Sequence, residues 1–135
     1  ASRGLGDVYK RQAISFVPRW ARYPFEIWIA PYRRTSNIFE LSENEQKDLA
    51  ELMLDASKSL DKVFDDPMPY TLAWQLSPKG YENSYHFHAC FQPIRRSKTK
   101  LKYLAGVEQI TGFFLVDLPP ERSARILRGE ELPDE

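Results

Sequence analysis

The stretch 84–93, SYHFHACFQP, holds the residues best suited to chemistry, because it contains both histidines and the single cysteine of the chain. Read with the two-residue period of a β-strand, it divides into an apolar face and a polar face. The polar face carries His86, His88 and Cys90. Imidazole and thiolate groups bind metals, and imidazole also moves protons and bonds phosphate. The simpler interpretation is a polar, half-exposed face without catalysis.

A metal site on this strand could not use all three of these side chains as ligands. Three same-face positions would span about 13 Å, so one ion cannot reach His86, His88 and Cys90 together. A site would use His88 and Cys90, or add a residue of another strand such as Gln75. Cys90 has no feature that marks it as a nucleophile, and isolated cysteines mostly behave as small packed residues.

A basic run follows the histidine stretch. A solvated loop is its common explanation, and a phosphate-facing edge is the functional one, because lysine offers a mobile charge and arginine a two-pronged fork. Gly106 permits a close backbone approach to a ligand, and the Glu108 carboxylate could accept hydrogen bonds from sugar hydroxyls. The run comprises Arg95, Arg96, Lys98, Lys100 and Lys102.

The surrounding pattern predicts the elements that position these residues. Ser42 and Glu45 form a capping box, and apolar residues at helical spacing follow it. Together the elements predict an α+β fold, an antiparallel sheet with one long helix on its apolar face and a short C-terminal helix. The expected strands cover 14–17, 25–30, 69–76, 84–92 and 112–116, and the expected helices 43–64 and 120–127.

Bulk properties narrow the class of protein. The 135 residues suit one domain or a piece of one. The net charge of zero argues against a nucleic-acid partner. No apolar run approaches the roughly 20 residues of a membrane span. We expect no signal peptide, and a single cysteine fits a reducing cytoplasm. Without an initiator methionine, the chain reads as a fragment.

The two ends differ from the middle. Residues 1–12 lack periodicity and contain GLGDVYKRQ, which resembles translated adapter sequence, so we interpret them as a non-native or disordered leader. Residues 13–129 form the expected domain. Residues 130–135 are an acidic tail that we expect to fray.

Five stretches carry a resemblance to a known family. They are VPRWARYPFEIWIAP, LSENEQKDLAELM, PYTLAWQLSP, YHFHACFQP and KYLAGVE, in this order. Through these stretches, residues 13 to about 128 resemble the C-terminal half of the galactose-1-phosphate uridylyltransferases. These belong to the histidine-triad (HIT-like) superfamily, so the resemblance implies a HIT-like fold.

The resemblance also implies that the catalytic histidine and the structural zinc lie in the N-terminal half of the full-length protein. In the family, a histidine in a His-Pro-His motif of the N-terminal half takes the uridylyl group from UDP-glucose and passes it to galactose 1-phosphate. This chain has no such motif, so it is expected to be inactive without that half and to supply no catalytic residue. The structural zinc of the family also lies in the missing half, and this fragment is not expected to bind it. The full-length protein is expected to be a cytoplasmic homodimer.

The family's hexose-phosphate segment matches residues 102–108. The resemblance implies that Lys102 pairs with phosphate and Glu108 binds hexose hydroxyls, with Tyr103 beside them. Val107 stands where some members have tyrosine. Some members bind a second metal at positions that match Gln75, His88 and Cys90, and two of these three residues differ from the family's histidines. The metal is therefore doubtful, and His86 is a possible site-lining residue.

Two other functions stay open at this point. A related HIT-like phosphorylase would split a nucleotide sugar or a dinucleoside polyphosphate with phosphate, using the same fold. A non-catalytic binding module would share the fold without the chemistry. A His-Pro-His motif upstream in the gene would favour an enzyme.

Overall fold

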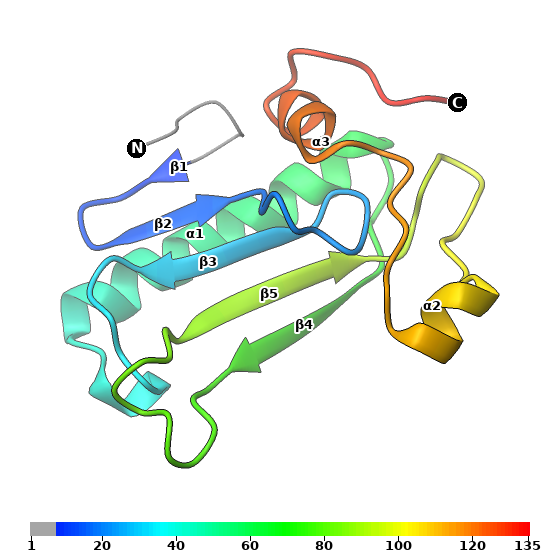
Figure 1. Ribbon diagram of the computed structural model, residues 1–135. Coiled ribbons are helices and arrows are strands. Elements are labelled where there is room, and N and C mark those ends of the chain that lie inside the picture. Colours follow the sequence, from blue (N-terminus) through cyan, green and yellow to red (C-terminus); the bar gives the residue numbers. More distant parts are fainter. Residues whose placement is uncertain (1–7) are drawn as a thin grey trace.

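The computed structural model describes residues 8–135, and its centre is a five-stranded antiparallel sheet. The strands lie in the order β1-β2-β3-β5-β4, so consecutive strands are neighbours except β3 and β4, between which β5 lies (Figure 1). The strands are β1 Val8–Tyr9, β2 Ala13–Phe16, β3 Ile27–Pro31, β4 Tyr70–Gln75 and β5 His88–Pro93. The helices are η1 Ile38–Glu40, α1 Glu43–Val63, α2 Gly106–Thr111 and α3 Pro120–Leu127.

Helix α1 begins and packs as the sequence predicts. The Glu45 backbone N–H donates to Ser42 Oγ at 3.2 Å, and the Ser42 N–H donates to Glu45 Oε1 at 2.9 Å, which completes the capping box. The helix lies behind the sheet, across β2 and β3 (Figure 1). The predicted α+β fold is therefore confirmed. The buried stripe of α1 consists of Leu49, Leu52, Ala56, Leu60 and Val63.

Strand alternation gives the sheet two different faces. In the pairing of β3 with β5, Ile29 lies opposite Ala89, and Trp28 lies opposite Cys90. Ile29 and Ala89 are completely buried and belong to the core with α1. Trp28 and Cys90, one residue along, must therefore point to the other face, and so does His88.

A strained residue joins β3 to α3. Phe25 has φ of 63°, which is uncommon for a bulky side chain. Its N–H donates to the Ser123 hydroxyl of α3 at 3.3 Å, and its ring packs edge-on against Phe64 at 5.7 Å. Burial of this ring offsets the local strain. The predicted helix over 120–127 is confirmed, and Gly129 adopts φ of 76° just beyond it.

Two predicted strands differ from the structure. Strand β5 begins at His88 instead of residue 84, because the Tyr85 N–H bonds the Tyr81 carbonyl in a turn. The strand predicted for 112–116 is wrong. This apolar segment has no neighbouring strand, and Phe113 is 76% exposed. The short helix α2 directly before it was not predicted.

The ends of the described chain are attached to the fold. Val8–Tyr9 pair with β2, and the Gln12 N–H donates to Asp48 of α1 at 2.8 Å, although no regular structure was expected there. Residues 1–7 of the predicted leader lie outside the described residues. Arg122 bonds Glu131 and Asp134 of the acidic tail, where fraying was expected. No helix within residues 8–135 is long and apolar enough to cross a membrane.

Candidate functional site

Two charged side chains meet beside the segment that follows α2. Lys102 Nζ lies 3.2 Å from Glu108 Oε2, and the two side chains are only 8% and 2% exposed. Lys102 Nζ also donates to the Leu115 carbonyl at 2.7 Å. Shielding from water strengthens such a pair relative to a surface ion pair. The sequence named both residues as a phosphate contact and a sugar contact, and the structure brings them together.

Glu108 also holds the local backbone. Its Oε1 accepts from the Ala105 N–H at 2.8 Å at the start of α2, and its Oε2 accepts from the Leu115 N–H at 3.0 Å. The bond from Ala105, then that from Leu115 and the neighbouring Lys102, hold the pKa of Glu108 below its usual value, although burial opposes the shift. The carboxylate is therefore ionised at neutral pH, and both of its oxygens have partners within the domain.

A hollow of about 180 Å³ opens beside this pair. Tyr103 lies in its wall and is 81% exposed, whereas Val107 is not part of the wall and is 44% exposed. A cation can pair with a phosphate group, and a carboxylate and a phenol can form hydrogen bonds with hydroxyl groups, so these side chains are of types that could bind a phosphorylated sugar. The lining residues are Arg96, Lys102, Tyr103, Ala105, Glu108, Leu115 and Asp117.

The sequence indicated one neighbour of this hollow, Arg96, and missed two others, Asp117 and Tyr23. Arg96 pairs with Asp117 at its rim, and both side chains stay about half exposed to solvent. The run itself was a signal for Arg96, but nothing in the pattern marked Asp117. The Tyr23 ring also lies 5.6 Å from Lys102 Nζ, and it comes from the distant loop between β2 and β3.

The residues proposed for a metal lie on the face of the sheet that points away from helix α1. Gln75 is the register partner of His88. The His88 ring stacks on Trp28, with 4.0 Å between the ring centres and an angle of 15°. Burial lowers the pKa of His88, which keeps the imidazole neutral. Burial, followed by the nearby charge of Glu26, raises the pKa of the Cys90 thiol to about 12.

These three residues do not fit a divalent metal. A zinc site takes three or four protein ligands, and only His88 and Cys90 of the three are residue types that commonly bind it. An amide such as Gln75 is a weak replacement for an imidazole. Residues 8–135 also contain no group of three or more His, Cys, Asp or Glu side chains arranged around a common point.

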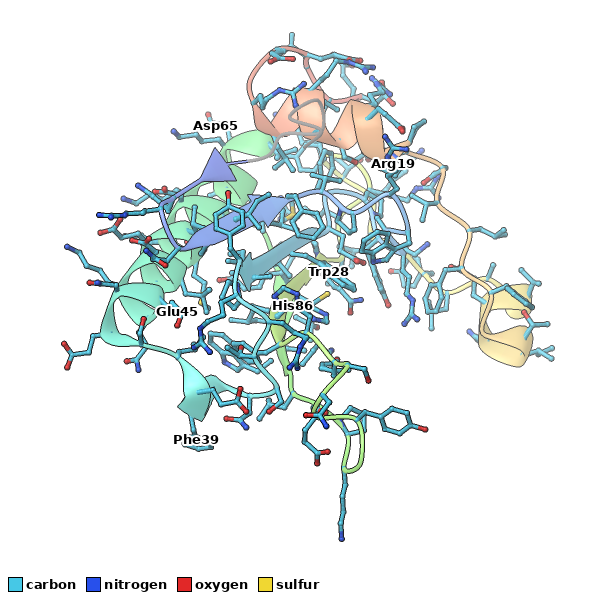
Figure 2. All side chains as sticks on the ribbon, turned by 60° about the vertical axis from the view of Figure 1, so that its left-hand side comes forward. Arg19, Trp28, Phe39, Glu45, Asp65 and His86 are labelled. Carbon is cyan, nitrogen blue, oxygen red and sulfur yellow. The ribbon has the colours of Figure 1, made fainter. Side chains whose placement is uncertain are left out.

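His86 has a different position from the one expected. It precedes β5, and its Nε2–H donates to the Pro31 carbonyl at 2.7 Å, so it ties the turn to the end of β3. The expectation that one strand carries both His86 and His88 is therefore wrong, because β5 begins at His88. In Figure 2, His86 lies over the middle of the molecule, whereas Phe39 points away from it.

Known proteins of similar sequence are uridylyltransferases. The chain is 36% identical to the galactose-1-phosphate uridylyltransferase of Thermotoga maritima over 122 residues, which cover 88% of the chain and 38% of the relative. It is 32% identical to the enzyme of Rattus norvegicus, covering 85% of the chain and 32% of the relative. The chain thus spans well under half of the relatives' length.

Solved structures give the same result for the fold. A uridylyltransferase mutant matches 96% of this chain, over 43% of its own, with 31% identity and a TM-score of 0.87. A HIT-like protein from Bartonella henselae matches 92% of this chain and 84% of its own with 14% identity and a TM-score of 0.63, which shows the shared HIT-like fold alone.

The family model described as galactose-1-phosphate uridyl transferase, C-terminal domain, matches residues 2–135. This match covers nearly the whole chain, and the uridylyltransferase structure has the same arrangement of elements. The C-terminal position of the domain also accounts for the limited share of each relative that the chain covers. The chain belongs to the galactose-1-phosphate uridyl transferase family, as its C-terminal domain.

Proposed function

We propose that the full-length protein transfers the uridylyl group from UDP-glucose to galactose 1-phosphate, and that this domain holds the hexose phosphate. The observation that carries the proposal is the buried pair of Lys102 and Glu108 beside the hollow. Lys102 would bond a phosphate oxygen, and Glu108 would accept from hexose hydroxyls. The relatives' names supply the reaction class, and the pair supplies the sugar-phosphate contact.

The reaction needs a nucleophile from the N-terminal half. As the family resemblance implies, a histidine nitrogen would attack the α-phosphorus of UDP-glucose, and the bond to glucose 1-phosphate would break. A phosphate oxygen of galactose 1-phosphate would then attack the same phosphorus, the N–P bond would break, and UDP-galactose would leave. Lys102 would neutralise phosphate charge on the hexose phosphate in both steps.

We further propose that the full-length protein is a homodimer that uses the region around α2. Residues between 103 and 115 expose several large apolar side chains, which is unusual for a surface that stays in water. A second copy of the full-length protein is the proposed occupant. The exposed side chains are Tyr103, Leu104, Val107, Ile110, Phe113 and Leu115.

The missing half is the other proposed partner. Strand β4 has a sheet neighbour on one side only within the described residues, so its second edge is available to further chain. As the family resemblance implies, a structural zinc would belong to that half. The free thiol of Cys90 suits a reducing compartment, and we propose the cytoplasm.

The test uses the full-length protein, obtained by joining this domain to its upstream coding sequence. We expect Lys102→Met to lower kcat/KM for galactose 1-phosphate by roughly 10- to 150-fold, as for the loss of a charged hydrogen bond. Lys98→Met is the matched control, because Lys98 is exposed in the same basic run. The proposal would be overturned if the wild-type protein transferred no uridylyl group from UDP-glucose and instead cleaved ADP-glucose with phosphate.

A further inference from the structure

Lys102 is held at three points, and one of them comes from a distant part of the chain. Its Nζ bonds the Leu115 carbonyl and pairs with Glu108, both within the same local segment. The third contact is the face of Tyr23, whose ring centre lies 5.6 Å from Nζ. A cation at this distance is attracted by the negative face of the ring.

The loop that carries Tyr23 is anchored to the sheet. The buried Glu26 carboxylate accepts from the Arg22 N–H at 3.1 Å and from Trp28 Nε1 at 2.8 Å. The Glu26 N–H donates to the Tyr23 carbonyl at 3.3 Å. These bonds hold the Tyr23 backbone in place relative to β3, which limits where its ring can lie beside Lys102.

Tyr23 also contacts the segment after α2. Its ring lies 5.9 Å from that of Phe114, and the Arg22 guanidinium lies 5.1 Å from the same Phe114 ring. Figure 1 shows the loop between β2 and β3 beside this segment. The loop therefore holds both Lys102 and the chain that provides its carbonyl partner, Leu115.

The hydrogen bonds of Lys102 leave room for one ligand contact. An ammonium group has three N–H donors. One bonds Leu115 and one faces Glu108, so a single donor stays available to a ligand in the adjacent hollow. Its direction depends on how the ammonium group is held, and the Tyr23 ring closes off one side of it.

We propose that Tyr23 is a positioning residue, which holds the Lys102 ammonium group ready for the phosphate of a sugar phosphate. This inference rests on the proposed function, because it assumes that Lys102 binds phosphate. It adds a residue outside the 102–108 segment. Aromatic character matters in this role, and the phenol hydroxyl does not.

Binding of galactose 1-phosphate to the full-length protein, in which this domain is joined to its upstream coding sequence, tests the proposal when it is measured by calorimetric titration. We expect Tyr23→Leu to weaken binding roughly 2- to 30-fold, the range of a cation–π contact. Tyr23→Phe keeps the ring and should bind as the wild type does. Tyr81→Leu is the matched control, because Tyr81 is 63% exposed and outside the hollow.

A double-mutant cycle separates positioning from a general structural effect. In a Lys102→Met background, Tyr23→Leu should cause no further loss of binding, because there is no cation left to position. An equal loss in both backgrounds, or a failure of Tyr23→Phe to restore binding, overturns the inference while the proposed function stands. If the wild type itself shows no binding, the hexose-phosphate site fails, and the inference fails with it.

Discussion

The Cys90 thiol should make the stability of this domain depend on pH in a defined way. Cys90 is 4% exposed, and burial raises its pKa from an ordinary value of 9.0 to about 12. The unfolded chain therefore loses the thiol proton first as the pH rises. The contribution of the protonated Cys90 thiol to the free energy of unfolding is complete below pH 9. It is lost between pH 9 and pH 12, because in that range the unfolded state binds fewer protons than the folded state.

The magnitude follows from the two pKa values. At pH 10 the difference in thiol ionisation lowers the free energy of unfolding by about 1.4 kcal/mol relative to pH 7. Cys90→Ala removes this titration and keeps the tyrosines and lysines that also titrate in this range. The stability of the wild type relative to Cys90→Ala should therefore fall by about 1.4 kcal/mol between the two pH values.

Urea unfolding of both proteins at pH 7 and pH 10, under reducing conditions, measures this difference. Comparison of the two proteins at each pH cancels the effects of the shared groups. A difference between the proteins that is the same at both pH values would refute the raised pKa.

Three further predictions concern the helix and the missing half. Leu52→Ala, in the core, should lower the free energy of unfolding by about 2–5 kcal/mol. Leu54→Ala on the exposed side of the same helix should stay within about 0.5 kcal/mol of the wild type in the same urea experiment. Ser42→Ala should cost about 1 kcal/mol through loss of the cap, and an unchanged stability would argue against the capping box. The 135-residue chain alone should release no glucose 1-phosphate from UDP-glucose, and turnover by it would place a nucleophile in this domain.

The elements that the sequence predicted well have strong local signals. Helix α1 combines a capping box with a long apolar stripe, so both its start and its buried face follow from the residues. The prolines around β3 and β5 limit those strands in the same way. Apolar composition alone misled at 112–116. A strand also needs a partner, and the Leu115 backbone is bonded by Lys102 and Glu108 instead.

The histidine stretch was predicted in part. Alternation gave the correct buried face, with Phe87, Ala89 and Phe91 almost fully buried. It could not show that the strand begins at His88, since the turn at Tyr81–Tyr85 depends on backbone bonds that leave no period in the sequence. His86 consequently lies between this turn and β5, so the two imidazoles that suggested a metal are not carried by one strand.

The candidate site shows a second limit, which concerns distance along the chain. Lys102 and Glu108 lie six residues apart and fall within one matched segment, so the resemblance could name both. Tyr23 lies about 80 residues earlier, in a loop whose path depends on the buried Glu26 and on Phe114 from the far end of the domain. A residue that acts on another side chain across such a separation becomes visible only once the fold has joined the two segments.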